Sequence, residues 1–533
     1  MTSVAFLLCL LAIFSVASGE REKRQTEDEA AFLHEICTGK GPGEWFRLEL
    51  KDCRDVYQCT EGGLQALRCP HGLAFDLDLQ TCDWGTSVKN CDKKTKIRKV
   101  KPLLNTPEPF DSQNQLACGD NTCIARELFC DGKADCADGS DENVCDISND
   151  PNAAPSCDKV ECTLPECFCY NQPYETPGNL KPETIPQMIM ITFDDAVNNN
   201  NVDLYTYLFN NERKNPNGCS IKSTFFVSHK YTNYSAVQEL YRQGHEIAVH
   251  SISHNDSESF WTEASKEEWA REMAGNREII KNFANISDQV IYGVRAPYLR
   301  VGGNNQFTMM EENFFLYDST ITAPLQNPPL WPYMLFYRMP HTCHGNGQKC
   351  PTRSFAIWEI VMNEMDRRED PNIEEDLPGC AMVDSCFSTK PTAEQFYNFL
   401  NNNFNRHYDT NRAPMGLFFH SAFLKNNQEI LDMFTYWLDE TLANYPDVYF
   451  VTMTQSLLWI QDPQPIANIG NYEAWKEACL PVGQPNCPGT AHNCELNTEE
   501  LPGETIRLPT CMTCPNRYPW LNDPQGLGRI GLF

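Results

Sequence analysis

Short apolar runs alternate with longer amphipathic stretches between residues 185 and 455 of the chain. The runs have the length and the Ile, Val and Phe content of buried strands, and the stretches between them have apolar residues at helical spacing. This alternation predicts an α/β fold with a mainly parallel sheet, and seven runs favour an irregular barrel. Strands are expected at Met188–Phe193, Ile221–Val227, Glu246–Val249, Val290–Val294, Phe314–Tyr317, Met415–Phe419 and Val448–Met453. Helices are expected at Lys266–Phe283, Ala393–Phe404 and Gln428–Tyr445.

Titratable side chains stand at or directly after the ends of five of these runs. In a parallel barrel the C-terminal strand ends meet at one mouth, so these side chains are expected to converge. Two histidines four residues apart and a carboxylate can hold zinc with one position open, while a further carboxylate and histidine can serve as base and acid. The set is Asp194, Asp195, His250, His254, Arg295, Asp318 and His420. The alternative interpretation is that each residue caps a strand or is a hydrogen-bonded polar group of the core.

Five segments around these residues resemble the five motifs of the NodB-type polysaccharide deacetylases, carbohydrate esterase family 4. The first three are Thr192-Phe193-Asp194-Asp195, His250-Ser251-Ile252-Ser253-His254 and Arg295-Ala296-Pro297-Tyr298. Asp318 with Trp331 is similar to the fourth, and Leu417-Phe418-Phe419-His420 is similar to the fifth, with Phe418 where leucine is more usual. Ala196 stands where the family often has glycine. The resemblance implies a NodB-type irregular (β/α) barrel that removes acetyl groups from a polysaccharide.

The resemblance implies a metal site with a base beside it. Asp195, His250 and His254 would hold the metal, which is usually Zn²⁺ but can be another divalent ion. Asp194 would be the base that takes a proton from water, and Arg295 would pair with Asp194 and tune it.

An acid, an oxyanion donor and a pocket are also implied by the resemblance. His420 would protonate the departing amine, oriented by Asp318. The backbone N–H of Tyr298 would stabilise the oxyanion of the tetrahedral intermediate. The pocket for the acetyl methyl group would be lined by Trp331, Leu417 and Phe418.

Six cysteines cluster between residues 37 and 91, a segment too short to build much apolar core without cross-links. Spacing alone leaves about 15 possible pairings. The segment resembles the peritrophin-A type of chitin-binding domain, and that family implies the pairs Cys37–Cys59, Cys53–Cys91 and Cys69–Cys82. Its aromatic residues can either stack on sugar rings or form the small core: Phe75 is assigned to the core, and sugar contacts are expected from Trp45, Tyr57 and Trp84.

A second cysteine cluster, at residues 118–145, is acidic. Four carboxylates within twelve residues repel one another unless a hard cation joins them, and Ca²⁺ prefers oxygen ligands. The segment resembles a low-density lipoprotein (LDL) receptor class A repeat, which implies calcium ligands from the side chains of Asp131, Asp135, Asp141 and Glu142 and from the carbonyls of Leu128 and Lys133. The implied disulfide cysteines are Cys118, Cys136, Cys130 and Cys145.

The usual first cysteine of such a repeat is absent here, and in the family it pairs with the residue that matches Cys123. The chain has 26 cysteines, of which Cys9 lies in the leader, so an odd number remains. Cys123 is therefore expected to be free or bonded to another chain, and a bond to another domain is the alternative.

Composition and leader place the chain outside the cell. Val4–Phe14 is an apolar run followed by the small residues Ala17-Ser18-Gly19, as in a secretory signal, and no later run is long enough for a membrane anchor. The sequons at Asn233, Asn255 and Asn285 are expected to carry glycans. A net charge of −29 excludes nucleic acid as a partner. The expected segments are a signal at 1–19, a chitin-binding domain at 37–91, a basic linker at 92–117, the repeat at 118–145 and a deacetylase domain with a cysteine-rich extension at 156–533.

The whole pattern resembles an arthropod-type chitin deacetylase of the extracellular matrix, such as cuticle. Such an enzyme hydrolyses N-acetylglucosamine units of chitin to glucosamine and acetate, and the repeat offers a surface for matrix proteins. One alternative is a matrix-organising chitin-binding protein with a weak or inactive site. A second alternative keeps the enzyme but takes peptidoglycan as the substrate.

Overall fold

The structure is a computed structural model, and it describes short stretches between residues 45 and 88 and most of residues 115–528, with gaps at 144, 346–347 and 373–378 and within 477–502. The chain divides into two compact units, residues 1–103 and 104–533. The leader and the basic linker lie outside the described residues. Within the described part, no helix is both long and apolar enough to cross a membrane.

The first unit contains two small antiparallel sheets. Strands β1 (Trp45–Phe46), β2 (Asp55–Thr60) and β3 (Gly63–Arg68) form one, and β4 (Leu73–Asp76) pairs with β5 (Thr81–Trp84) in the other. Phe75 is 1% exposed, which confirms its assignment to the small core. The side chains of Trp45, Tyr57 and Trp84 and the six cysteines lie outside the described residues.

The second unit is built on a nine-stranded sheet in the order β14-β15-β12-β11-β10-β9-β8-β19, with β20 paired to the start of β8. All pairs are parallel except β14 with β15, so the C-terminal strand ends lie at one edge. This open, irregular (β/α) barrel confirms the predicted fold class. Its strands are β8 (Gln187–Asp194), β9 (Thr224–Val227), β10 (Glu246–Val249), β11 (Gly293–Val294), β12 (Tyr317–Asp318), β14 (Tyr333–Met334), β15 (Trp358–Glu359), β19 (Met415–His420) and β20 (Val448–Phe450).

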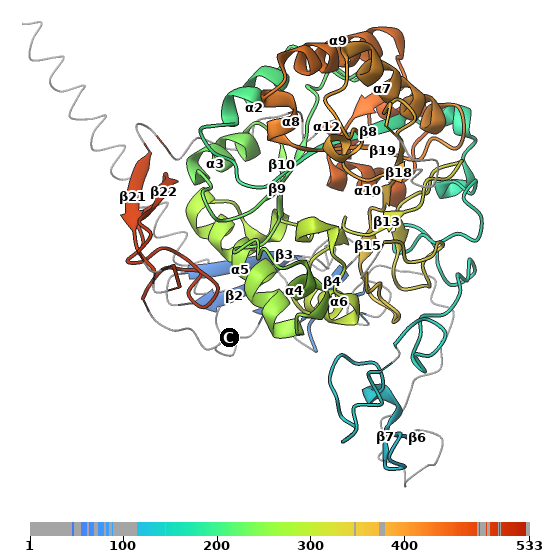
Figure 1. Cartoon of the computed structure of the whole chain (residues 1–533), viewed down its shortest axis with the longest axis vertical. Coiled ribbons are helices and arrows are strands. Elements are labelled where there is room, and N and C mark those ends of the chain that lie inside the picture. Colours follow the sequence, from blue (N-terminus) through green and yellow to red (C-terminus); the bar gives the residue numbers. More distant parts are fainter. Residues whose placement is uncertain are drawn as a thin grey trace, which may run out of the picture. The chain divides into compact units, whose positions relative to one another are not determined.

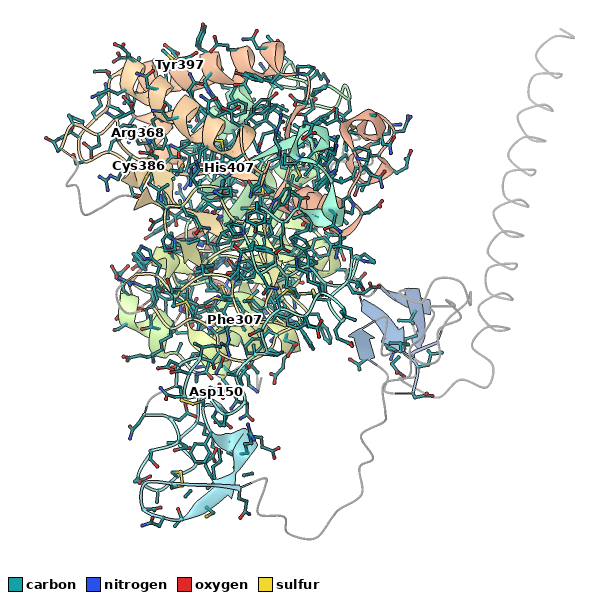
Figure 2. All side chains as sticks on the ribbon, turned by 90° about the vertical axis from the view of Figure 1, so that its right-hand side faces the viewer. Asp150, Phe307, Arg368, Cys386, Tyr397 and His407 are labelled. Atoms are coloured by element: carbon teal, nitrogen blue, oxygen red, sulfur yellow. A yellow bond between two sulfur atoms is a disulfide. The ribbon has the colours of Figure 1, made fainter. Side chains whose placement is uncertain are left out.

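Helices surround the strands of this sheet, as Figure 1 shows for α3, α5, α7 and α9. The three predicted helices are present and begin at the predicted residues, two of them with capping boxes that satisfy their first N–H groups. Buried side chains such as Phe307 and His407 fill the interior (Figure 2). The α-helices of the described residues are α2 (Val202–Leu208), α3 (Tyr234–Arg242), α4 (Glu258–Glu263), α5 (Lys266–Ala284), α6 (Gly303–Glu312), α7 (Ala393–Tyr408), α8 (Ser421–Lys425), α9 (Gln428–Asn444), α10 (Met453–Gln461), α11 (Ile466–Ile469) and α12 (Glu473–Lys476).

Four predicted strands are shorter than expected. Ile221–Val227 forms a strand only from Thr224, and Tyr317 alone of Phe314–Tyr317 lies in a strand. The run Val290–Val294 begins with the last residue of the 3-10 turn η4 (Asp288–Val290), and only its last two residues pair in the sheet as β11. The run Val448–Met453 ends as a strand at Phe450, because Thr452 caps α10 and accepts the N–H of Gln455. In this last run the cap of α10 overrides the β-propensity of the sequence.

The cysteine-rich repeat belongs to the same compact unit as the barrel. It has a short hairpin, β6 (Gln115–Ala117) with β7 (Cys123–Ala125), the turn η1 (Arg126–Leu128), and the disulfides Cys118–Cys136 and Cys130–Cys145. The disulfide cysteines predicted for this segment are therefore confirmed. Cys123 is exposed and is the free cysteine of the described residues.

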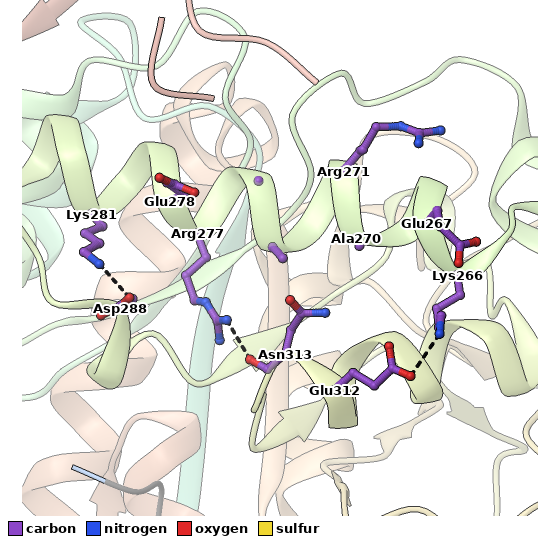
Figure 3. A pocket seen from close by; sticks show the side chains of 12 residues that line it. Lys266, Glu267, Ala270, Arg271, Arg277, Glu278, Lys281, Asp288, Glu312 and Asn313 are labelled. Atoms are coloured by element: carbon purple, nitrogen blue, oxygen red, sulfur yellow. Dashed lines mark hydrogen bonds and ion pairs between the residues drawn. The ribbon is translucent and has the colours of Figure 1, made fainter. Parts of the chain in front are cut away.

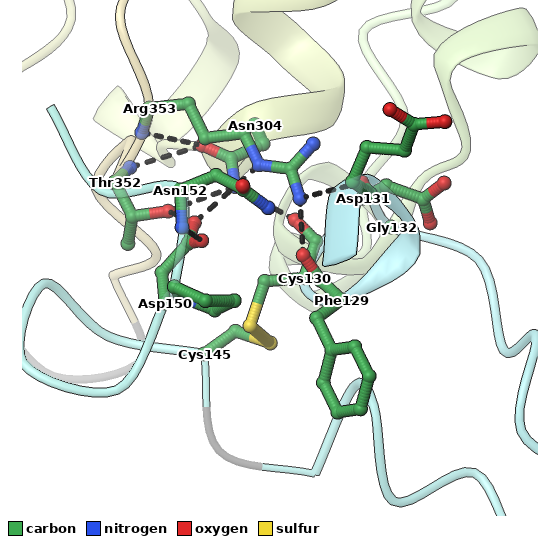
Figure 4. A network of polar contacts seen from close by, with 12 residues as sticks. Phe129, Cys130, Asp131, Gly132, Cys145, Asp150, Asn152, Asn304, Thr352 and Arg353 are labelled. Carbon is green, nitrogen blue, oxygen red and sulfur yellow. Dashed lines mark hydrogen bonds and ion pairs between the residues drawn. A yellow bond between two sulfur atoms is a disulfide. The ribbon is translucent and has the colours of Figure 1, made fainter. Parts of the chain in front are cut away.

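The repeat contacts the barrel domain through a polar network (Figure 4). The Arg353 guanidinium donates to the carbonyls of Glu127 and Phe129 and pairs with Asp150, whose side chain is buried at this junction. Asn304, on α6, donates to the carbonyl of Cys130 at 3.1 Å. The two domains are thus joined by hydrogen bonds to backbone carbonyls of the repeat.

Seven disulfides pair all fourteen cysteines that follow residue 156. Two of them close the C-terminal extension around the hairpin β21 (His492–Leu496) with β22 (Ile506–Thr510). This extension packs on the barrel domain, because Thr510 donates to the Phe283 carbonyl and His229 bonds to the Pro519 carbonyl.

Candidate active site

Strand register decides which side chains face the mouth. In β8, Phe193 packs against Tyr205 of α2, so it points to the helix side of the sheet, and its neighbours Thr192 and Asp194 point inward. In β19, Phe418 pairs with Thr192 and His420 pairs with Asp194, so these two side chains also point inward. The inward face of these two strands therefore carries Asp194 and His420, two of the residues predicted for the site.

Asp194 and Arg295 form a buried ion pair at the mouth. Arg295 Nη1 lies 2.7 Å from Asp194 Oδ1 and 2.8 Å from Thr192 Oγ1, and the guanidinium is fully buried. Its other nitrogens donate to the carbonyl and hydroxyl of Ser319, and its plane packs on the ring of Phe226 at 4.0 Å. These contacts fix the guanidinium and hold one oxygen of Asp194 in place.

Asp195, His250 and His254 gather their ligand atoms within 4.8 Å of one another. Asp195 Oδ1 lies 3.4 Å from His254 Nε2 and 3.8 Å from His250 Nε2. Tetrahedral ligands on zinc, at about 2.0–2.1 Å from the ion, lie roughly 3.4 Å apart, so the three donors fit such an ion. His250 donates from Nδ1 to the Arg295 carbonyl at 2.8 Å, which leaves Nε2 as the free ligand nitrogen. Burial lowers the pKa of His250, which favours the neutral, metal-binding form.

The backbone at the mouth is strained. Asp195, Ser251, His254 and Tyr298 all have positive φ, between 46° and 81°, although none is glycine. The ring of Tyr298 is partly exposed and lies edge-on to His254, with ring centroids 5.0 Å apart. The tight turns after β8, β10 and β11 thus bring the metal donors and the predicted oxyanion donor together.

His420 is oriented by Asp384, a residue that the sequence did not indicate. His420 Nδ1 donates to Asp384 Oδ2 at 2.6 Å, and its Nε2 lies 3.9 Å from Asp195 Oδ2. Burial on its own lowers the pKa of His420, but the hydrogen bond to Asp384 and the charges of Asp384, Asp194 and Asp195 outweigh it and raise the pKa to about 9. In these surroundings the imidazole is protonated at neutral pH.

The prediction that Asp318 orients His420 is wrong. Asp318 follows Tyr317, whose hydroxyl donates to Glu246 inside the barrel, so the Asp318 side chain points to the opposite, helix side. There it accepts hydrogen bonds from Gln306 of α6 and from Thr320. Burial raises the pKa of Asp318 to about 6, and the residue has no contact with His420.

Asp384 was missed because it follows no strand of the barrel. It lies in the 3-10 turn η6 (Val383–Ser385) of the long insertion between β15 and β19, inside the loop that Cys380 and Cys386 close. The two close cysteines were the available sequence signal for a rigid loop, but nothing in the sequence shows where that loop lies.

The predicted pocket role is also wrong for two of the three residues. Trp331 is fully buried and stacks on Trp459 of α10, and Leu417 is fully buried on the helix side, because its pairing partner is Ile191 rather than Thr192. Neither has surface that a substrate can reach. Phe418 faces inward as expected, but its ring packs on the Arg295 guanidinium at 4.6 Å and is 1% exposed.

The four predicted calcium-binding acids lie together in the repeat. Asp135 Oδ2 and Asp141 Oδ1 are buried without a hydrogen-bond partner, which is costly for carboxylate oxygens unless a cation joins them. Burial is the main cause that raises the pKa of Asp131 and of Glu142. No three of the four acids have oxygens all within 4.8 Å of one another in the part described, so the cage is more open than the Asp195 cluster. Among the predicted carbonyl ligands, Leu128 ends η1, and Lys133 is held by a hydrogen bond from its N–H to Asp131.

The three sequons differ in their exposure. Asn285 is exposed at the C-terminal end of α5. Asn233 is half-buried and caps α3, accepting from the N–H groups of Ser235 and Ala236. Asn255 is half-buried directly after His254.

Two other hollows in the described residues lack the predicted catalytic groups. A groove of about 560 Å³ along the outer side of α5 is closed by the ion pairs Lys266–Glu312 and Lys281–Asp288 (Figure 3). A cleft of about 900 Å³ lies between the repeat and the barrel domain and has no Phe, Tyr or Trp side chain in its lining. Neither is lined by Asp194, His420 or a residue of the Asp195 cluster.

Comparisons with known proteins identify family models and relatives that this chain resembles. Family models match residues 181–309 as polysaccharide deacetylase, 37–91 as chitin binding Peritrophin-A domain and 112–145 as low-density lipoprotein receptor domain class A. The chain is 61% identical to chitin deacetylase 1 of Bombyx mori, over 98% of this chain and 97% of that protein. It is 36% identical to chitin deacetylase 8 of Bombyx mori, over 70% of this chain and 94% of that protein. The solved chitin deacetylase of Colletotrichum lindemuthianum matches 51% of this chain and 88% of that chain, at 14% identity and a TM-score of 0.27.

Proposed function

Because the chain belongs to the chitin deacetylase family, we propose that it hydrolyses the N-acetyl groups of chitin and leaves glucosamine units and acetate. The observation that carries this proposal is that three groups of side chains converge at one mouth of the barrel. Asp194 with Arg295 supplies a base, the Asp195 cluster supplies metal donors, and His420 with Asp384 supplies an acid. An inactive matrix protein has no need to keep all three.

Asp194 is placed to accept the proton of the attacking water. One of its oxygens is held by Arg295, so the other is available toward the mouth. Arg295 also places a fixed positive charge 2.7 Å from this carboxylate. As the water oxygen forms its bond to the acetyl carbon, its proton passes to Asp194.

His420 is placed to protonate the leaving nitrogen. Its Nδ1 is committed to Asp384, so Nε2 carries the proton that faces the mouth. When the C–N bond breaks, this proton goes to the amine, and the products are an amino sugar and acetate. Base and acid come from paired positions on neighbouring strands, which places them on one face.

Asp195, His250 and His254 are the residues that would hold a divalent metal, and Zn²⁺ suits their nitrogen and oxygen donors. A metal bound there would act as a Lewis acid on the acetyl carbonyl and the water. We further assign the Tyr298 backbone N–H as a donor to the developing oxyanion, because its turn lies beside His254.

The flanking modules would hold the enzyme on its substrate in an extracellular chitin matrix. The segment at 37–91 would bind solid chitin and raise the local concentration of acetyl groups. The repeat would bind Ca²⁺ through Asp131, Asp135, Asp141 and Glu142, since two of their oxygens are buried and unpaired. Its exposed surface and Cys123 remain available to matrix proteins.

Acetate release from matched substrates tests the substrate class. The purified full-length chain is incubated with N-acetylglucosamine oligomers and, separately, with peptidoglycan fragments of equal acetyl content. Faster release from the chitin oligomers supports the proposal, and release from peptidoglycan alone would assign the other substrate.

A further inference from the structure

The segment that joins the two metal histidines is not held by the sheet. β10 ends at Val249, and residues 251–254 form a turn in which Ser251 and His254 both have positive φ. Both histidine rings must nevertheless point at Asp195 to bind one ion. Contacts from outside the turn are therefore needed to fix it.

Glu272, on α5, supplies three of these contacts. Its Oε2 accepts the backbone N–H groups of Ile252 and Ser253, each at 2.9 Å, and its Oε1 accepts the hydroxyl of Ser253. The Glu272 carboxylate is 1% exposed and has no basic partner among these bonds. Burying a carboxylate costs free energy. Because the acceptor atoms of Glu272 all bond to one short turn, these bonds indicate that the turn depends on Glu272.

Asn276, one helical turn further along α5, holds the base of the same turn. Its Nδ2 donates to the carbonyls of Val227 and Ser251, at 2.7 and 2.8 Å, and so joins the end of β9 to the start of the turn. Gly275 allows the close approach, because a Cβ at this position would lie 3.0 Å from the Ile252 side chain. The two polar side chains lie four residues apart and thus on one face of α5.

We propose that Glu272 is a positioning residue that sets the distance between His250 and His254, with Asn276 as its support. The inference rests on the proposed metal site at Asp195, His250 and His254. Glu272 touches neither the metal donors nor the substrate position, and it acts by fixing the peptide between the two histidines. Its loss lets the turn relax, so that one histidine no longer meets the ion at bonding distance.

Zinc affinity of the full-length chain tests this, measured by competition with a chromogenic chelator. Glu272→Met fills a similar volume but accepts no hydrogen bond, and we expect it to weaken zinc binding about 10-fold to 100-fold. Glu272→Gln keeps an acceptor for the two N–H groups and should restore the affinity to within about threefold of wild type. Cobalt(II) spectra of the same variants report the geometry of the donors directly. Glu267→Gln, an exposed position on the same helix, is the control and should bind zinc like the wild type.

The outcomes separate this inference from the proposed function. If wild type binds one zinc and Glu272→Met binds it equally well with the same cobalt spectrum, the positioning role is wrong and the metal site stands. If wild type binds no zinc, the metal site and the positioning role both fail. Should Glu272→Met not fold, Ser253→Ala decides, because it removes one of the three bonds: a twofold or greater loss of affinity supports the role, and unchanged affinity contradicts it.

Discussion

Asp194 and Asp195 are adjacent in sequence but stand in different surroundings. Asp194 is buried beside the Arg295 guanidinium, whereas the Asp195 side chain is 46% exposed and faces two histidine nitrogens. Asp194, held beside a fixed cation, is suited to accept a proton, and Asp195, beside two imidazoles, is suited to bind a metal. Extended backbone would put these consecutive side chains on opposite faces of the sheet, and the left-handed backbone at Asp195 departs from that alternation.

Asp194→Asn is expected to keep the metal and lose turnover. Asparagine fills similar space but cannot take up a proton, so kcat should fall about 10²-fold to 10⁴-fold. Elemental analysis and acetate release on the same preparation check both halves. Unchanged kcat with full metal content would remove Asp194 from the role of base.

Asp384→Asn should move the alkaline limb of the kcat profile to lower pH. The acid must be protonated, so activity falls as pH rises through the pKa of His420, which Asp384 helps to raise to about 9. Loss of the Asp384 charge lowers that pKa by about 1–3 units, and the fall then begins at lower pH.

Asp318→Asn is the matched control for that profile, since Asp318 points to the helix side of the sheet. Its alkaline limb should coincide with that of the wild type. If the alkaline limb moves with Asp318→Asn and not with Asp384→Asn, then Asp318 rather than Asp384 orients His420.

Among the elements, the strands could be predicted from the sequence, whereas the position of the insertion between β15 and β19 could not. Runs such as Glu246–Val249 are buried on both faces and read as strands from composition alone, and their ends located Asp194, His250 and His420. Leu417 and Asp318 were misplaced because sequence order near a strand end does not give the inward face. Strand register decides it, of β19 with β8 for Leu417 and of β12 with β11 for Asp318. Asp384 needed the folded position of a loop outside the barrel sheet.

The disulfide across the Asp384 turn is expected to support catalysis. Replacing Cys380 and Cys386 with alanine frees η6, so Asp384 spends less time on His420, and kcat should fall about 10-fold to 100-fold. Zinc content should stay at the wild-type level, because the metal donors lie on other loops. A variant with wild-type kcat would show that the turn is held by its other contacts.

At the scale of the molecule, the repeat is fixed to the barrel domain by few groups. Arg353 reaches two backbone carbonyls of the repeat and the buried carboxylate of Asp150. The sequence could show that both domains exist, but not that they touch, because backbone carbonyls carry no sequence pattern.

Arg353→Ala should loosen this junction. Proteolysis between residues 145 and 155 is expected to speed up, while acetate release from soluble oligomers stays near the wild-type rate, since the junction shares no residue with the active site. Arg368→Ala is the control, because that exposed arginine pairs with Asp366 away from the junction. Equal cleavage of both variants would show that Asn304 and the remaining contacts suffice.

Deletion of residues 1–105 should separate binding from chemistry. The first compact unit ends at residue 103, so the rest of the chain retains its own core. We expect the shortened protein to act on soluble oligomers at a similar rate and to bind chitin beads about tenfold or more weakly. Equal retention of both proteins on the beads would place the chitin contacts elsewhere.

The central claim, that this chain is a metal-dependent deacetylase, is tested most directly by titrating zinc back into the chelated full-length protein while acetate release from chitin oligomers is measured. The site predicts that activity disappears with the chelator and returns in proportion to zinc, reaching its plateau at one ion per chain bound by Asp195, His250 and His254. Acetate release that persists without metal, or no release at full zinc occupancy, would contradict it.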